Sequence, residues 1–219
     1  MTALPASPLG LRQLLMPVFF MGDYVHIDLS VKNRELGGQE FASPEKFNDY
    51  LSKYLQKSGM KVAYGGYHEK RGLYNRSNLF SAAEKEGLDR NIHLGIDIWA
   101  EENTPVLAVL SGKLHSFQDN SAFGDYGPTI ILEHRIENYI FYTLYGHLSR
   151  QSLSSLEIGQ DFEQGEKIAE LGGASENGNY APHLHFQVIK DLEGKRGDYP
   201  GVASEIGIRF YLKNCPDPN

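Results

Sequence analysis

The chain has 219 residues, of which 41% are hydrophobic and 22% are charged, so it can bury enough apolar surface to form a folded domain. Its formal net charge is -7 and its Lys and Arg residues form no cluster, so it lacks the electrostatic footprint of a nucleic-acid-binding protein. This length suits one sizeable core or two small ones, and we expect one catalytic domain with additions.

The longest apolar run near the start, Leu14 to Met21, is interrupted by Pro17 and has no basic leader or small-residue cleavage site. It is too short for a membrane span, which needs about 20 residues, and it is not typical of a signal peptide. The sequence therefore predicts no membrane span and a cytoplasmic location. It leaves the oligomeric state open.

Two elements are expected near the start of the chain. Residues 24–31 alternate apolar and polar side chains, which predicts a half-buried strand. Ser43 is a suitable N-cap with Pro44 at the first helical position, apolar residues then recur at helical spacing, and Gly59 supplies a stop. This pattern predicts an amphipathic helix.

Residues 64–91 show no periodicity and are rich in Tyr, Gly, Arg and Asn, which predicts a long irregular segment. Arg71 and Arg76 are candidates to pair with a substrate carboxylate, but a solvated surface position is the more ordinary expectation. Several tyrosines could line a substrate groove or pack within loops: Tyr64, Tyr67, Tyr74, Tyr126 and Tyr180.

Beyond residue 91 the pattern becomes that of short strands separated by Gly, Asn and Asp turns. The expected strands are Leu94 to Trp99, Val106 to Leu110, Lys113 to Phe117, Thr129 to His134, Tyr139 to Tyr145, Lys167 to Leu171 and His183 to Val188. This succession predicts a mainly β protein, α+β overall, with an antiparallel sheet. Cys215, the one cysteine, cannot form an internal disulfide, and we expect it to face solvent.

Four of the eight histidines fall in three short motifs that also contain turn residues. The motifs are His93-Leu-Gly-Ile-Asp97, Tyr145-Gly-His147-Leu and Pro182-His183-Leu-His185-Phe. In a straight strand, His93 and Asp97 would lie about 13 Å apart, which is too far for two ligands of one ion. Gly95, which lacks a Cβ atom, can let the backbone bend and bring the two side chains together.

His183 and His185 are two residues apart, so in a strand their side chains share a face. One of them can then bind a metal while the other addresses a substrate. Two histidines and one carboxylate would leave a tetrahedral zinc ion with an open position, which is typical of a catalytic site. Zinc there lowers the pKa of bound water and polarises a carbonyl oxygen, and the remaining histidines would act on protons or on the oxyanion.

The three motifs, in this order, resemble those of the lysostaphin-type zinc metallopeptidases, the LytM-like peptidoglycan endopeptidases. The resemblance covers roughly residues 90 to 189 and includes Thr104-Pro105-Val106 and Ser111-Gly112 at the family's spacing. It implies that His93, Asp97 and His185 hold Zn²⁺, and that His147 and His183 act on the water and the tetrahedral intermediate. It also implies a duplicated hybrid motif fold with a groove between strands.

The resemblance implies hydrolysis of peptide or amide bonds, either in peptidoglycan cross-links or in a small amide. On this basis, residues 1–60 form an N-terminal α/β extension, residues 61–190 the metallopeptidase domain, and residues 191–219 a C-terminal tail. One departure is Gln187, where the family often has Glu.

Two other functions remain open at this level. A LytM-like module without catalytic activity could dock on and regulate a partner, although every ligand type is retained here. A non-haem iron oxygenase also uses two histidines and a carboxylate, but it usually spaces the first pair two residues apart rather than four.

Overall fold

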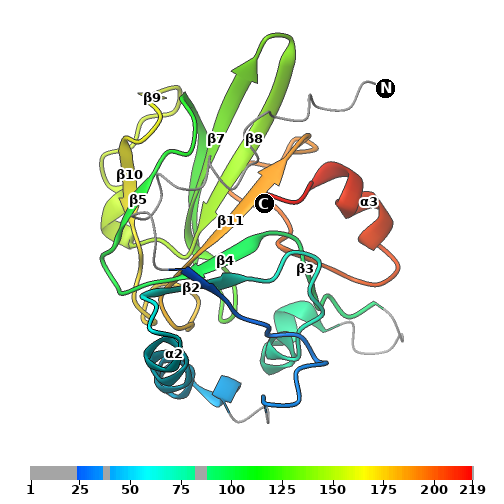
Figure 1. Cartoon of the computed structure of the whole chain (residues 1–219). Helices are drawn as coiled ribbons and strands as arrows, with labels where there is room; N and C mark the ends of the chain where they lie inside the picture. Colours follow the sequence, from blue (N-terminus) through cyan, green and yellow to red (C-terminus); the bar gives the residue numbers. More distant parts are fainter. Residues whose placement is uncertain (1–23, 37–39, 82–87, 219) are drawn as a thin grey trace.

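The computed structural model describes residues 24–36, 40–81 and 88–218. An eight-stranded sheet with the order β1-β2-β4-β11-β8-β7-β6-β9 runs through the centre of the molecule (Figure 1). Its strands are β1 (Tyr24–His26), β2 (Val62–Gly65), β4 (Ile96–Trp99), β6 (Gly112–Asn120), β7 (Gly127–Ile136), β8 (Tyr139–Gly146), β9 (Asp161–Phe162) and β11 (His183–Ile189). All neighbouring pairs are antiparallel except β1 and β2. The expected mainly β, antiparallel class is confirmed.

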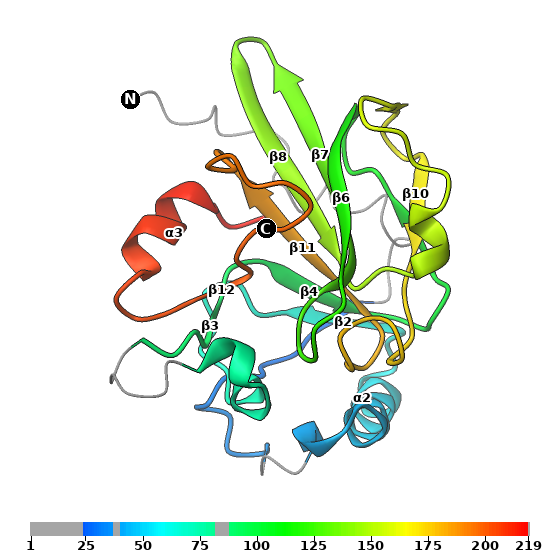
Figure 2. The same cartoon turned by 180° about the vertical axis from the view of Figure 1, so that it is seen from behind.

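Smaller elements cover the two sides of this sheet (Figures 1 and 2). Two short antiparallel pairs are β5 (Pro105–Leu107) with β10 (Lys167–Glu170), and β3 (Ile92–His93) with β12 (Val202–Ala203). The described residues form the α-helices α2 (Pro44–Ser58) and α3 (Ile208–Asn214) and the 3₁₀ turns η2 (Glu40–Ala42), η3 (Leu73–Arg76), η4 (Asn78–Phe80) and η5 (Arg150–Leu153).

Alternation along the central strands supplies two apolar layers. Ile130 and Tyr145 lie in the layer on the β5–β10 side, whereas their neighbours Ile131 and Leu144 lie in the layer with the C-terminal residues. Successive side chains of a strand point to opposite faces, so each central strand contributes to both layers. Cys215 belongs to the second layer and is fully buried. The expectation of a solvent-facing thiol was wrong, because α3 and the residues after it pack onto the sheet.

The N-terminal strand is shorter than expected. Regular pairing ends at His26, and Ile27 and Leu29 are buried beyond it, but Val31 is 57% exposed. The Leu29 amide donates to Oε1 of Glu69 rather than to the backbone of a neighbouring strand, so the hydrogen bonding between strands does not continue at this residue. The prediction of one strand over residues 24–31 was therefore wrong in length. The apolar run Leu14 to Met21 lies outside the described residues.

Helix α2 forms where the sequence predicts it. The Ser43 hydroxyl accepts a hydrogen bond from the Lys46 amide, Pro44 occupies the first turn, and Gly59 ends the helix in the left-handed conformation at φ 71°. Its buried face carries Phe47, whose ring packs edge-on against Trp99 with the ring centroids 6.1 Å apart. The helix thus covers the β2–β4 end of the sheet.

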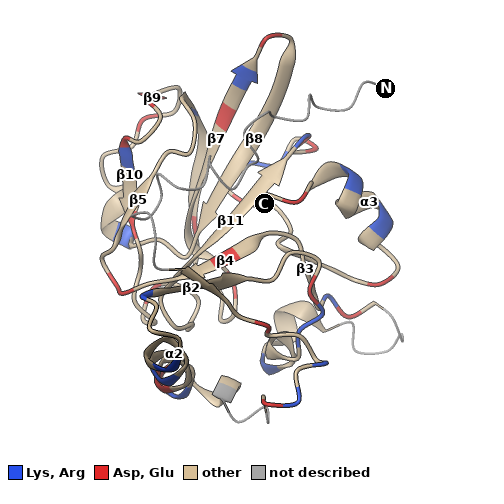
Figure 3. Cartoon of the chain, viewed as in Figure 1, with Lys and Arg blue, Asp and Glu red and all other residues tan. Residues whose placement is uncertain are grey.

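Charged residues are spread over the molecule. Lys and Arg occur on α2, on α3 and near the tip of the β7–β8 hairpin, which lie far apart (Figure 3). None of the helices formed by the described residues is long and apolar enough to cross a membrane.

Phe47→Ala should loosen α2 from the sheet. Removing a buried phenylalanine lowers the free energy of unfolding by about 3–5 kcal/mol. Trp99 is the one tryptophan of the chain and is 4% exposed, and its exposure to water should increase. Urea unfolding and the wavelength of tryptophan emission measure both effects. Phe210→Ala, at a 49% exposed position on α3, should leave the emission unchanged. Equal emission in the Phe47 variant and the unaltered protein would contradict this packing.

Candidate metal centre

The pairing of the central strands brings two of the predicted ligands together. Asp97 on β4 lies directly opposite His185 on β11, and His185 lies opposite Gly146, the last residue of β8. Directly opposite residues of an antiparallel pair have their Cβ atoms about 4.5–5.5 Å apart on one face. The register of three strands therefore places Asp97 and His185 side by side, with His147 at the next position after β8.

His93 reaches the same point because the expected strand Leu94 to Trp99 is interrupted. His93 belongs to β3, the Leu94 amide donates to the carbonyl of Gly201, and β4 begins only at Ile96. A Cβ atom on Gly95 would lie 2.5 Å from the carbonyl oxygen of Phe186 and 2.8 Å from Nε2 of His185. Glycine is needed here because β11 approaches closely, and its φ is not in the left-handed region.

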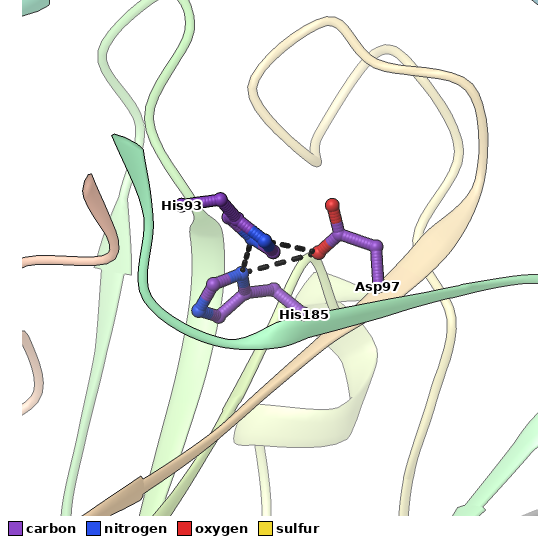
Figure 4. Close-up of side chains that lie close together, drawn as sticks. All are labelled: His93, Asp97 and His185. Carbon is purple, nitrogen blue, oxygen red and sulfur yellow. Dashed lines mark hydrogen bonds and ion pairs between the residues drawn. The ribbon is translucent and has the colours of Figure 1, made fainter. Parts of the chain in front are cut away.

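The three predicted ligand atoms form a compact triangle (Figure 4). Nε2 of His93 lies 2.8 Å from Nδ1 of His185 and 3.2 Å from Oδ1 of Asp97, and the third edge is 3.1 Å. All three side chains are buried. Ligand atoms of a tetrahedral zinc ion at about 2.0–2.1 Å from the metal lie about 3.3 Å from one another. The triangle fits that ion closely, with its edges slightly short.

Hydrogen bonds fix which nitrogen of each histidine is free. Nδ1 of His93 donates to the carbonyl oxygen of Gly66 at 2.9 Å, which leaves the lone pair on Nε2. Nε2 of His185 donates to Oε1 of Gln187 at 3.0 Å, which leaves the lone pair on Nδ1. The amide nitrogen of Gln187 is bound to the Pro200 carbonyl and the Cys215 sulfur, so its oxygen must face His185. Gln187 therefore orients the ring of His185, as the outer partners of metal-binding histidines commonly do.

His147 and His183 lie beside this triangle. Their Nδ1 atoms bond to the carbonyl oxygens of Asn177 and Ala181, at 2.8 and 2.7 Å. Their rings are 4.1 Å apart between centroids, and Nε2 of His183 is 3.9 Å from Oδ1 of Asp97. The structure thus gathers all five predicted site residues, and within the described part of the chain Nε2 of His147 and of His183 has no backbone partner.

Burial and charge set the protonation of these groups. Burial lowers the pKa of His93 to about 3, with Arg71 adding to the effect. Burial also lowers the pKa of His183, and together with His183 it lowers that of His147 well below the usual value. Burial alone would raise the pKa of Asp97, but His93 and Arg71 outweigh it and hold that pKa well below its usual range. Near neutral pH, these three imidazoles are neutral and the carboxylate is charged.

A cavity opens onto the five residues. Its walls are formed by residues between β2 and β3, by the turn before β7, and by Lys195 with residues 198–202. Tyr74, Tyr126 and Tyr180 line it, whereas Tyr64 and Tyr67 line a separate hollow. Charged side chains also border the cavity: Arg90, Asp125, Lys195 and Asp198.

The sequence did not predict that Arg71 would be buried against Asp97. Its guanidinium is 1% exposed and donates to Oδ2 of Asp97 at 2.5 Å, so the expectation of a solvated position was wrong. Arg76 lies partly buried over the ring of Tyr180, with 4.3 Å between Cζ and the ring centroid. Arg71 could not be assigned from sequence because its partner lies 26 residues away and no local pattern links the two.

The sequence of this region matches a known family. Residues 91–198 match the model of peptidase family M23. This part of the chain is an M23 peptidase domain. This match confirms the resemblance that the three histidine motifs indicated. The matched residues include His93, Asp97, His147, His183 and His185. Comparison with curated proteins gives no significant match.

Solved structures are similar over part of the chain. The catalytic domain of lysostaphin, an antimicrobial peptidase from Staphylococcus simulans, is 25% identical, and the match covers 55% of this chain and 80% of that one with a TM-score of 0.39. A zinc-containing peptidase from Vibrio cholerae is 29% identical over 46% of this chain and 28% of that one, with a TM-score of 0.37. A chain of the SpoIIIAH and SpoIIQ complex is 19% identical over 68% and 92%, with a TM-score of 0.41.

Buried neutral histidines make the stability of the M23 domain depend on pH. Below about pH 6.5 the unfolded chain takes up protons at these residues, whereas the folded, metal-free protein does not until their lowered pKa values are reached. The free energy of unfolding should therefore fall as pH drops from about 6.5, by up to about 1.4 kcal/mol per pH unit for each such histidine.

Urea unfolding with a chelator present, between pH 7.5 and 4.5, measures this slope. His134 is buried outside the metal centre, where it bonds to the Ser111 carbonyl and the Thr143 hydroxyl, and burial lowers its pKa. His134→Gln should make the slope shallower by the share of one histidine. A free energy of unfolding that stays constant across this range would contradict the burial of neutral imidazoles.

Proposed function

We propose that this protein is a zinc-dependent metallopeptidase that hydrolyses peptide or other amide bonds. The observation that carries the proposal is the triangle of His93, Asp97 and His185, whose three lone-pair atoms lie 2.8–3.2 Å apart with both histidine tautomers fixed from outside. Membership of a peptidase family over residues 91–198 supports it independently.

The donor set favours zinc. Two neutral imidazoles and one carboxylate are the ligands of many catalytic zinc sites, and three protein ligands leave a fourth position open. Zinc bound there would supply Lewis acidity, which lowers the pKa of a coordinated water and polarises the carbonyl of the scissile bond. The cysteine sulfur takes no part in this set, because Cys215 bonds to Gln187 on the outer side of His185.

His147 and His183 are suited to move protons during hydrolysis. Their neutral state leaves Nε2 able to accept a proton from the attacking water and to return it to the leaving amine. The ring that has taken this proton can also donate a hydrogen bond from Nε2 to the developing oxyanion before it returns the proton. Packing fixes both rings: His183 stacks on Trp99 with 5.8 Å between centroids, and His147 contacts Tyr180 edge-on at 5.1 Å.

The cavity supports a peptide or a small amide as substrate. Aromatic side chains form much of its lining, and Arg90 and Lys195 border it together with Asp125 and Asp198. A mixture of aromatic surfaces and charges of both signs suits short peptides that carry amino and carboxylate groups. Peptides of bacterial cell-wall cross-links and short acyl amides are the two substrate classes to compare.

Two variants separate metal binding from catalysis. Asp97→Asn should lose zinc, because the amide is a poor ligand and no longer offers the charge that the ion needs. His147→Ala should keep about one zinc per chain and lose turnover by about 10²–10⁴-fold. Elemental analysis after dialysis and hydrolysis of oligoglycine, cell-wall peptides and short amides measure the two properties.

Two outcomes would contradict the proposal. The first is a purified protein that holds well below one zinc per chain and cleaves none of these substrates after zinc is added, which would favour a binding or regulatory module. The second is oxygen consumption with ferrous iron, which would favour an iron oxygenase.

A further inference from the structure

An ion pair outside the matched M23 segment contacts the metal centre. Arg71 lies between β2 and η3, about twenty residues before the matched segment begins at residue 91. Among the described residues, Arg71 has the largest side chain that is fully buried. A buried guanidinium is costly unless it is paired and hydrogen-bonded on several sides, so its partners indicate what it does.

The guanidinium is held from two directions. Nη1 donates to Oδ2 of Asp97, and Nε donates to Oε2 of Glu69, both at 2.5 Å. Glu69 is itself fixed, because its Oε1 accepts the amide of Leu29 at 3.0 Å. A Cβ atom on Gly66 would lie 1.7 Å from Nη2, so this glycine makes room for the arginine. The absence of a side chain at Gly66 thus lets Arg71 reach the carboxylate of Asp97.

Because of this contact, the two carboxylate oxygens of Asp97 have different partners. Oδ1 faces Nε2 of His93 and Nδ1 of His185, whereas Oδ2 is taken by Arg71. A carboxylate that bound a metal through both oxygens would have to weaken or break the charged hydrogen bond to the buried guanidinium of Arg71. The arrangement therefore favours coordination through Oδ1 alone.

Glu69 keeps the net charge around Asp97 negative, which favours the binding of a cation. Arg71 alone would cancel the charge of Asp97 and oppose a divalent ion, but the second carboxylate restores a net negative charge to the buried group of three. The pair of Arg71 and Glu69 thus orients Asp97 without removing the attraction for the metal.

We propose that Arg71, held by Glu69, is a positioning residue that restricts Asp97 to one metal-binding oxygen and so keeps a coordination position open for the reaction. This inference rests on the proposed zinc site. It assigns to a segment before the M23 match a function in the metal centre.

Cobalt substitution tests this role without a substrate. Four-coordinate Co²⁺ absorbs visible light much more strongly than five- or six-coordinate Co²⁺, so the spectrum reports the coordination number. The unaltered protein should give the intense spectrum. Arg71→Gln should give a weaker one, because the released Oδ2 can also bind. Its zinc affinity in chelator competition should fall by about 10–100-fold, because the loss of the fixed Asp97 orientation outweighs the removal of one positive charge.

Further variants separate positioning from general damage. Arg71→Lys keeps the charge and should restore part of the affinity, and Glu69→Gln, which leaves Arg71 in place, should weaken zinc less than Arg71→Gln. Arg76→Gln removes a guanidinium that contacts Asn179 and Tyr180 but no metal ligand, and it should keep the intense spectrum. Where Arg71→Gln fails to fold, Arg71→Lys and Glu69→Gln provide the same comparison.

The outcomes distinguish this inference from the function on which it rests. Spectra and zinc affinities that are unchanged in Arg71→Gln, or in the two milder variants where that protein does not fold, would overturn the positioning role and leave the zinc site standing. An unaltered protein that binds neither Co²⁺ nor Zn²⁺ would overturn the proposed function itself.

Discussion

The site depends on the antiparallel pairing of β4 with β11, which sets Asp97 directly opposite His185. A shift of one residue in this register would turn either side chain to the other face of the sheet. Both strands are buried, and Ile96 and Leu184 lie in one apolar layer, so such a shift would also remove one of these side chains from that layer. The same hydrophobic packing that stabilises the sheet therefore fixes the proposed metal site, and Gly95 lets the chain approach β11 closely enough to add His93.

Segments on both sides of the M23 match complete this centre. From the N-terminal side, the Gly66 carbonyl orients His93 and Arg71 orients Asp97. From the C-terminal side, the Pro200 carbonyl and Cys215 fix the amide of Gln187, which orients His185. Each of the three proposed ligands thus has an outer partner that depends on residues outside 91–198. The matched M23 segment and its flanking segments together form the proposed metal site.

The sequence predicted which residues lie together in the candidate site better than it predicted their surroundings, for a physical reason. Histidine, aspartate and glycine at His93, Asp97 and Gly95 form a local pattern whose chemistry is visible in a few residues, and α2 was equally evident from its caps. Arg71 was placed at the surface because its partner is distant along the chain, and Cys215 because nothing local shows that α3 covers it. The strand at residues 24–31 was predicted too long because alternation reports burial, and burial continues at Ile27 and Leu29 after pairing ends.

X-ray absorption spectroscopy of the zinc-loaded protein would show whether two imidazoles and one carboxylate oxygen hold a catalytic zinc ion. The expected spectrum has a first shell of nitrogen and oxygen atoms at about 2.0–2.1 Å, with the outer scattering of two imidazole rings and room for one further oxygen. A sulfur neighbour at about 2.3 Å, or a shell without imidazole scattering, would place the metal elsewhere and contradict it.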